Sequence, residues 1–427
     1  MASAESLIAE YMLNTDRGPE HDDGSRVTPV DSSAVRLIAF YLPQFHAIPE
    51  NDRWWGAGFT EWTNVTKALP RFAGHYQPRL PGALGFYDLS ETKALRRQAE
   101  LARRYGIHGF CFHHYWFGGD RLLERPLDNL LANPDIDLPF CINWANENWS
   151  RRWDGRDDDI LMAQNHSPED DLAFARSIEP LFADPRYIRI DGRPLLMLYR
   201  PGILPDATAT IDRWRNHFVR IGEVDPFIVM AQAFGDEDPR SYGMDGAVAF
   251  PPHRAGDGLC QIEPPARYDH GFRGTIRSYH QLAQASIAHQ PEGYIFFPGV
   301  CPQWDNEARK PARGMVYAGS TPSLYGQWLD AECRRVLDRE PDHRIVFINA
   351  WNEWAEGAHL EPDRHYGHAY LAATAQVLSK LDRPAAVGFD APTAMSGPES
   401  GWRRRLRLLM NGMARILDGA ARGLRSL

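Results

Sequence analysis

The 427-residue sequence lacks a hydrophobic run long enough to cross a membrane, and it contains only five cysteines. No stretch approaches the roughly 18 apolar residues that a transmembrane helix needs. The cysteines show no paired spacing, and Cys111 and Cys141 lie inside apolar runs, so we interpret them as reduced core residues. The N-terminal stretch MASAESLIAEYMLNTDRGPEHDDG has neither a basic n-region nor a continuous apolar h-region, so it predicts no secretory signal. These features favour a cytoplasmic location.

An excess of positive charge is also missing. The formal net charge is −9 at pH 7, so the composition does not indicate nucleic acid as a partner. Aromatic residues are plentiful by contrast, with 13 tryptophans, many of them beside polar residues. Because a buried indole needs a partner for its N–H group, this clustering is typical of a binding cleft lined by rings.

Apolar, β-branched runs alternate with helical patterns along the chain. We expect strands at 35–42, 106–116, 138–145, 193–199, 226–232, 244–250, 293–300 and 344–351. We expect helices near 90–105, 121–133, 168–183, 206–221, 275–289, 322–340 and 366–381. Continuous apolar strands between helices indicate parallel strands that are covered on both faces. Eight such units predict an α/β fold of the (β/α)8 TIM-barrel type, and the sequence has no G-x-G-x-x-G turn or P-loop that would favour an open doubly wound sheet.

Composition divides the chain into four parts. Residues 1–33 are polar and acidic and are expected to form a flexible N-terminal arm, and residues 34–382 hold the barrel. Residues 383–401 are rich in Pro, Gly, Ala and Ser, which indicates a linker. Residues 402–427 combine an apolar stripe at helical spacing with seven arginines and predict a basic amphipathic helix. Two roles stay open for it, a peripheral anchor on the inner membrane surface and a helix docked on the barrel.

Rings, amides and acids gather where the predicted strands end. The segments are YLPQFH (41–46), HHYW (113–116), NWANENW (143–149), QWDN (303–306) and AWNEWAEG (350–357). The active site of a barrel lies at the carboxyl ends of its strands, so these segments are expected to surround one site.

Two glutamates in the last segment are the candidate catalytic residues. Glycosidic-bond chemistry needs one carboxylic acid to protonate the leaving oxygen and one carboxylate to act as nucleophile or base. Glu353 and Glu356 are three residues apart, so a helical turn would place them on one face. Mutual repulsion and the neighbouring indoles would keep one of them protonated. The alternative is a solvated acidic pair at the start of a surface helix.

Three further groups have less specific signals. Glu147, in the similar stretch WANENW, is a rival catalytic acid or a substrate contact, and the alternative is an ion pair with Arg151 or Arg152. His113 and His114 are adjacent, so on a strand they face opposite sides and cannot easily bind one metal ion. One is expected to contact a sugar hydroxyl and the other to lie in the core. The loop NDRWWGAGFTEW (51–62) suits either a subsite wall or aromatic anchors for the loop.

The sequence resembles the WbsX family, also described as glycoside hydrolase family 99-like. The blocks that carry the resemblance are AFYLPQFHAIPENDRWWGAGFTEWTNV (39–65), HYQPRLPGALGFYDL (75–89), GIHGFCFHHYWF (106–117), INWANENWSRRWDG (142–155) and NAWNEWAEGAHLEPD (349–363). They occur in this order between about residues 35 and 382. The resemblance therefore implies that residues 34–382 form a family 99-like catalytic barrel.

The resemblance also implies a mechanism. Characterised family 99 enzymes are retaining, metal-independent endo-α-mannosidases that use two glutamates of a W-N-E-W-x-E-G motif. By that likeness Glu353 would deprotonate the sugar 2-hydroxyl, which attacks the anomeric carbon, and Glu356 would protonate the leaving oxygen. The mannosidases usually have His where this chain has Ala355, so the resemblance implies the mechanism and not the sugar. WbsX proteins are associated with bacterial surface-polysaccharide clusters and were named glycosyltransferases.

Three functions are therefore considered, in decreasing order of preference. They are a hydrolase or transglycosidase of a bacterial polysaccharide or its precursor, a glycosyltransferase of O-antigen or capsule biosynthesis, and a non-catalytic carbohydrate-binding barrel. No cofactor or metal is expected. The expected substrate-binding residues are Tyr41, Trp54, Trp55, Glu61, Trp62, His113, His114, Tyr115, Trp116, Trp144, Asn146, Glu147, Trp149, Trp304, Trp351 and Asn352.

Overall fold

A computed structural model describes residues 4–26, 30, 34–151, 156–222, 224–264 and 266–381. The predicted linker (383–401) and basic helix (402–427) lie outside these residues. Within the described part of the chain, no helix is long and apolar enough to cross a membrane.

The centre of the fold is a nearly closed ring of parallel strands. In spatial order they are β1 (Arg36–Tyr41), β2 (Ile107–Phe117), β4 (Phe140–Trp144), β8 (Arg193–Leu198), β9 (Phe227–Gln232), β10 (Gly246–Ala249), the β12–β13 pair (Ile295–Phe297 and Gly299–Val300) and β15 (Ile345–Ile348). β15 pairs with β1, and the ladder is interrupted only between β12 and β13, so the described strands form a nearly closed barrel. All eight strand positions predicted from the sequence are present, and the (β/α)8 fold class is confirmed.

The seventh position of the ring is divided between two strands. β12 pairs with β10, and β13 pairs with β15. Pro298, which separates them, has no N–H group to donate, but its carbonyl accepts a bond from the Phe347 amide at 2.9 Å. At Gly299 a Cβ atom would lie 2.3 Å from the carbonyl oxygen of Ala249, so only glycine allows the two backbones to approach this closely.

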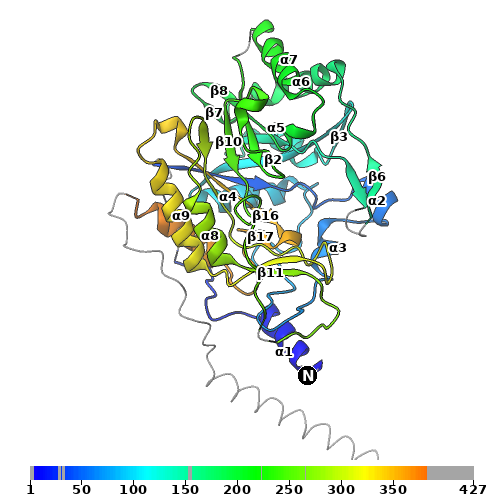
Figure 1. The fold of residues 1–427 in the computed structure, drawn as a ribbon, viewed down its shortest axis with the longest axis vertical. Helices are drawn as coiled ribbons and strands as arrows, with labels where there is room; N and C mark the ends of the chain where they lie inside the picture. Colours follow the sequence, from blue (N-terminus) through cyan, green and yellow to red (C-terminus); the bar gives the residue numbers. More distant parts are fainter. Residues whose placement is uncertain are drawn as a thin grey trace, which may run out of the picture. The chain divides into compact units, whose positions relative to one another are not determined.

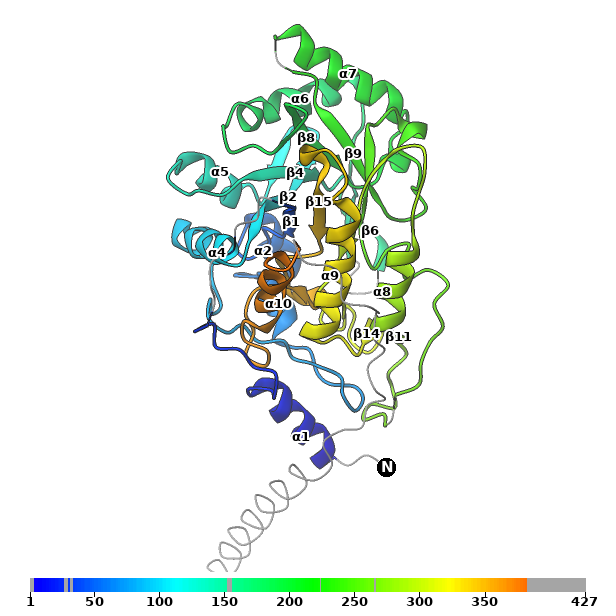
Figure 2. The ribbon, with the colours of Figure 1, turned by 90° about the vertical axis from the view of Figure 1, so that its left-hand side faces the viewer.

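Helices cover the outside of the ring, as Figure 2 shows. They are α4 (Thr92–Arg104), α5 (Arg125–Ala132), α6 (Pro168–Phe182), α7 (Ala207–Arg220), α8 (Tyr279–Ala288), α9 (Pro322–Val336) and α10 (Ala369–Leu378). In α4 the buried residues are Leu95, Gln98, Ala99 and Ala102, the spacing of a helix with one face on a sheet. Capping side chains fix several starts; the Ser167 side chain, for example, accepts a bond from the Asp170 amide at the start of α6. Between β9 and β10 the described chain has a 3₁₀ turn in place of an α-helix.

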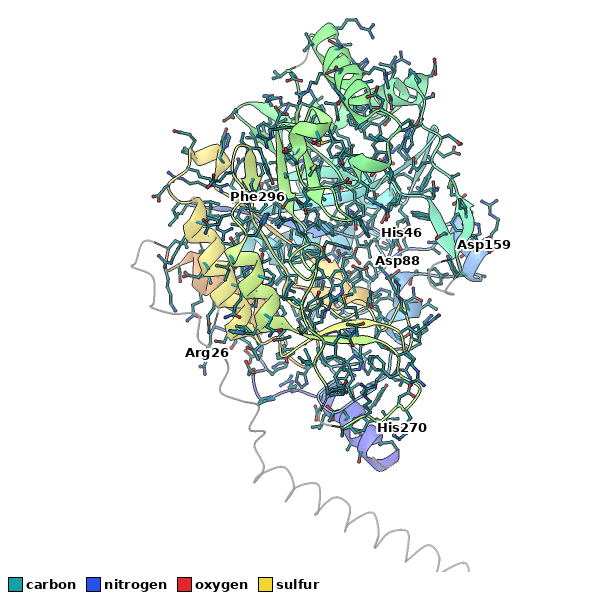
Figure 3. The ribbon with its side chains drawn as sticks, in the orientation of Figure 1. Arg26, His46, Asp88, Asp159, His270 and Phe296 are labelled. Atoms are coloured by element: carbon teal, nitrogen blue, oxygen red, sulfur yellow. The ribbon has the colours of Figure 1, made fainter. Side chains whose placement is uncertain are left out.

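Shorter elements lie outside the ring, and several of them are labelled in Figure 1. The helices are α2 (Pro49–Trp55) and α3 (Glu61–Val65). The strands are β3 (Asp120–Leu122), β5 (Trp149–Arg151), β6 (Arg156–Met162), β7 (Arg189–Ile190), β11 (Thr275–Ser278), β14 (Met315–Ala318), β16 (Asn352–Glu353) and β17 (Ala358–His359). In Figure 3, His46 of the loop after β1 and Asp159 of β6 lie on the same side of the molecule. The Trp54 and Trp149 rings join these two regions with their centroids 5.8 Å apart.

Much of the expected flexible arm is held against the barrel. Residues Ala4–Thr15 form helix α1. The buried Asn14 amide donates to the carbonyl oxygens of His75 and Gln77 at 2.8 and 2.9 Å. Further along, Gly18 donates to the carbonyl of His365. Polar residues of this stretch form hydrogen bonds with the barrel domain. Residues 4–26 are therefore not the flexible arm that their polar composition suggested.

Candidate active site

A cleft with a volume of about 350 Å³ opens where the parallel strands end. Its lining comes from the carboxyl-terminal part of β2 and from segments that follow β1, β4, β8, β9, β10, β13 and β15, so every strand position of the barrel contributes. Both candidate catalytic residues, Glu353 and Glu356, line it. The expectation that the polar strand exits converge on one site therefore agrees with the geometry.

The two glutamates are held by a tight hairpin. β16 pairs antiparallel with β17, and residues Trp354–Glu356 form a 3₁₀ turn between them. Gly357 follows with φ of +62°, and a Cβ atom there would lie 2.7 Å from Arg79 Nε. Glycine is thus required both by the left-handed backbone and by the packing of Arg79. The turn is tighter than the helical turn expected from the spacing of the glutamates.

One arginine contacts both glutamates and a third carboxylate. Arg309 donates from Nη2 to Glu353 Oε2 at 2.9 Å and from Nη1 to Glu356 Oε1 at 2.7 Å. Its Nε donates to Oε1 of Glu61 at 2.7 Å. The guanidinium is largely buried, and every donor nitrogen of its fork has a carboxylate partner. These short, charge-assisted bonds fix the positions of three carboxyl groups from two loops.

Burial raises the pKa of both glutamates. For Glu353 the effect of burial is opposed by the charge of Arg309 and reinforced by Glu356 and Glu61. For Glu356, burial again raises the pKa, against the opposing charge of Arg309. The Glu353 side chain is 8% exposed and that of Glu356 is 22% exposed, so Glu356 presents more of its carboxyl group to the cleft. A pair of carboxyls that retains a proton near neutrality is the arrangement that acid–base chemistry requires.

The two histidines lie on opposite sides of β2, as their adjacency predicts. His113 lines the cleft, with Nε2 3.8 Å from Glu353 Oε1 and Nδ1 3.2 Å from the Asn143 side-chain amide. Burial, with the charge of Arg309, lowers the His113 pKa to about 4, so this ring is neutral at neutral pH. His114 is buried outside the cleft, edge-on to Phe174.

Glu147 forms an ion pair at another corner of the cleft. Its Oε1 accepts from Arg200 Nη1 at 2.6 Å. The expected partners Arg151 and Arg152 have side chains outside the described part of the chain, so an ion pair with them stays an expectation. Asn146 fixes this corner, because its side chain both donates to the carbonyl of Arg200 and accepts from its amide. The Arg200 guanidinium also lies over the ring of Phe234, 4.3 Å from its centroid.

Aromatic side chains line the cleft in two groups. One group follows β1, β2 and β4 and contains Trp55, Tyr115 and Trp149. The other follows β8, β9, β10 and β13 and contains Tyr199, Phe234, Phe250, His253 and Trp304. Since β15 lies between β13 and β1 in the ring, Glu353 and Glu356 stand between the two groups.

Ten of the expected substrate-binding residues lie outside this lining. They are Tyr41, Trp54, Glu61, Trp62, His114, Trp116, Trp144, Asn146, Trp351 and Asn352. Most are buried and have structural partners: Tyr41 donates to Gln98, Trp116 to Asp170 and Trp62 to the carbonyl of Tyr87. These residues lie close to the strand ends in sequence because they pack beneath the cleft and support it.

The two indoles beside the glutamates are among these buried residues. Trp354 stacks on His359 with ring centroids 3.8 Å apart and donates to Glu361. Trp351 packs against Phe110. The expected indole walls around the carboxyl groups are therefore not found; the indoles anchor the hairpin from below. Asn352 also lies below the site. Its side-chain amide accepts a hydrogen bond from the N–H of Leu42 and donates one to the carbonyl of Leu42.

The segment after β13 supports the hairpin from the other side. The Asp305 amide donates to the carbonyl of Glu356 at 2.6 Å. The buried Asp305 carboxylate is itself held by His75 Nε2 at 2.9 Å and Gln77 Nε2 at 2.8 Å. The HYQPR stretch (75–79) thus has a definite role, since it fixes the segment that contacts the backbone of Glu356.

Four further residues line the cleft that the sequence patterns did not predict: Arg309, Tyr199, Phe234 and His253. Arg309 lies three residues beyond the QWDN segment, and Tyr199 ends the fourth predicted strand. Their positions at the ends of predicted strands are the signal that could have identified both as candidate site residues. Among the described residues, no group of three or more His, Cys, Asp or Glu side chains could hold a metal ion.

A family comparison identifies the chain. The family model described as Glycosyltransferase WbsX matches residues 37–374, which is most of the chain. The chain belongs to the WbsX family. This WbsX-family chain is also 47% identical over 351 residues to the uncharacterized protein WxcX of Xanthomonas campestris pv. campestris, in strains ATCC 33913 and B100. The alignment covers 81% of the chain and 50% of WxcX, so the chain spans about half the length of these curated relatives.

Solved structures share the fold of the WbsX-family chain at low sequence identity. The GH99 endo-α-mannosidase from Bacteroides thetaiotaomicron, in complex with bis-tris-propane, aligns with a TM-score of 0.51 and 16% identity, over 83% of this chain and 98% of the mannosidase. A structure described as a glycoside hydrolase-like protein aligns with a TM-score of 0.53 and 14% identity, over 84% of this chain and 99% of that one. At these identities the likeness establishes the barrel fold.

Proposed function

We propose that the protein is a carbohydrate-active enzyme that cleaves or transfers glycosidic bonds of a bacterial surface polysaccharide or its precursor. The observation that carries the proposal is the pair Glu353 and Glu356, held on one guanidinium at the carboxyl end of the barrel. Membership of the WbsX family and the likeness to the GH99 fold support a polysaccharide-active enzyme. The rings along the cleft suit a substrate of several sugar units.

In the proposed reaction the two glutamates have different tasks. Glu356, the more exposed, donates its proton to the leaving oxygen and later activates water or an acceptor hydroxyl. Glu353, deeper in the cleft beside the neutral His113, removes a proton from the sugar 2-hydroxyl, whose oxygen attacks the anomeric carbon. Burial raises the pKa of both groups, which favours a protonated acid in the pair and makes Glu353 a stronger base once it is ionised. Two displacements at one carbon retain its configuration.

A glycosyltransferase is the second candidate, because the matching family is described by that activity. Such an enzyme would take its sugar from a nucleotide donor. The Asp157–Asp159 triplet, the nearest sequence to a nucleotide-sugar motif, belongs to strand β6. The proposal favours the hydrolase or transglycosidase because the glutamate pair supplies both of the groups that glycosidic-bond cleavage needs.

An activity screen separates the two candidates. The pure protein is incubated with bacterial surface glycans and lipid-linked oligosaccharides, with and without sugar nucleotides and EDTA. We expect bond cleavage or transfer without a sugar nucleotide and in the presence of EDTA. Turnover that requires a sugar nucleotide and is restored after chelation by manganese or magnesium would assign the protein to the glycosyltransferases.

Substitution of the carboxyl groups tests the assignment of acid and base. Glu353→Gln and Glu356→Gln keep the side-chain volume but cannot exchange the proton, so each is expected to lower kcat by about 10²–10⁴-fold. Glu147→Gln is the matched comparison, because Glu147 lines the same cleft but is paired with Arg200. It is expected to raise KM with a much smaller effect on kcat. A full loss of kcat in Glu147→Gln together with an active Glu356→Gln would move the acid to Glu147.

Phe234 is proposed as a platform for a sugar ring. It is 49% exposed at the cleft, although a large apolar ring gains most from burial. Its φ of +53° is costly for a bulky residue, and such strain is common at ligand sites. Arg200 and His253 pack on the ring and leave the remaining surface for the apolar face of a sugar.

Phe234→Ala should therefore raise KM about tenfold, the effect of losing roughly 1.4 kcal/mol of binding, while Phe234→Tyr should keep KM near that of the wild type. Steady-state kinetics on the substrate found in the screen provides the measurement. Phe86→Ala, which removes a phenylalanine that is 57% exposed outside the cleft, is the control. An unchanged KM in Phe234→Ala would remove this residue from the binding surface.

A further inference from the structure

Glu61 is a buried carboxylate that does not line the cleft. It begins α3, in the loop after β1, and its side chain is 0% exposed. Oε1 accepts from Arg309 Nε at 2.7 Å, whereas Oε2 has no hydrogen-bond partner among the described residues. A buried carboxylate with half of its bonding capacity unused is costly, which indicates that the charge itself has a purpose.

The surroundings of Arg309 leave the cluster short of positive charge. Three carboxylates share one guanidinium, so the cluster would carry a net charge of −2 if every group were ionised. His113 lies against it but is neutral at neutral pH, because burial lowers its pKa to about 4. Burial also raises the pKa of Tyr115 and Tyr199, which face the cluster from β2 and from the end of β8. Lys310, at the edge of the cleft, lowers the pKa of Glu356 in part.

We propose that Glu61 is a positioning residue for the reaction: it fixes the Arg309 guanidinium through Nε, so that the two Nη atoms hold Glu353 and Glu356, and its charge makes the cluster retain a proton. This inference rests on the proposed function, because the retained proton serves catalysis only if the two glutamates act as acid and base. The geometry supports it directly, because a planar guanidinium that is bonded at Nε can rotate little, and its remaining donors then have fixed directions.

The signs of the electrostatic effects give opposite expectations for two substitutions. Glu61 raises the pKa of Glu353 and Glu356 by repulsion, and Arg309 lowers both. Glu61→Gln removes the charge but keeps an oxygen that can accept from Arg309 Nε. It should therefore lower both glutamate pKa values, by about one unit. Arg309→Gln should raise them. If Glu61 contributed packing alone, Glu61→Gln, which keeps the side-chain volume, would shift neither pKa.

The test is a carboxyl titration that needs no substrate. The full chain is labelled with [δ-¹³C]glutamate, and NMR follows the carboxyl resonances with pH. The resonances of Glu353 and Glu356 are identified by their loss in Glu353→Gln and Glu356→Gln. The control is Glu50→Gln, the same change in the same loop at a residue paired with Arg53 outside the cleft. Opposite shifts in Glu61→Gln and Arg309→Gln, with none in Glu50→Gln, support the inference. Titrations in Glu61→Gln that match the wild type overturn it.

Two further measurements keep the test decisive. If Glu61→Gln does not fold, Glu61→Asp keeps the charge on a shorter side chain. It should leave both titrations near those of the wild type and lower kcat more than it changes KM; an unchanged kcat would contradict the positioning role. The pH optimum of turnover in Glu61→Gln should move to lower pH. If the titration shifts but no variant or wild type turns over a glycan, the charge coupling holds and the proposed function fails, so the two failures are distinguishable.

Discussion

The ion pairs of Arg309 are the constraint on which the site depends. A single guanidinium brings together a carboxylate from the loop after β1 and two from the hairpin after β15. Removing one partner of a buried charge network typically costs about 3–5 kcal/mol, because it leaves an uncompensated charge. The loops after β1, β13 and β15 are therefore coupled, although each contributes only short elements to the fold. The same contacts affect the pKa of the two glutamates. Arg309 therefore determines both where the carboxyl groups lie and how readily they bind a proton.

Layers of hydrogen bonds beneath the cleft keep this network in place. His75 and Gln77 hold Asp305, whose amide contacts the carbonyl of Glu356. On the other side, Asn352 ties the hairpin to the end of β1, and Trp354 anchors it to Glu361. The residues that border the cleft can then differ in size or chemistry without moving the carboxyl groups. This separation of a fixed centre from a variable rim is how barrel enzymes accommodate different substrates.

The sequence predicted the strands well because parallel strands buried on both faces are continuous apolar runs, such as RLIAFY and IVFI. It predicted that the two glutamates lie at the carboxyl end of the barrel because they follow the last strand. It did not predict which neighbouring rings face the cleft, since a strand sends successive side chains to opposite sides: Trp351 and Trp354 entered the core, whereas Trp149 and Trp304 reached the lining. Arg309 was missed because its carboxylate partners are 44, 47 and 248 residues away in sequence, beyond the reach of local spacing.

We propose that the arginine-held glutamate pair carries out a double displacement at the anomeric carbon. The stereochemistry of the first product tests it most directly, because it reports on the reaction rather than on the loss of a residue. ¹H NMR can follow the anomeric signal of the product in the first minutes of turnover, before the anomers equilibrate. Retention of the configuration of the broken bond is the result that this account predicts. A first product of the opposite configuration would show a single displacement and contradict it.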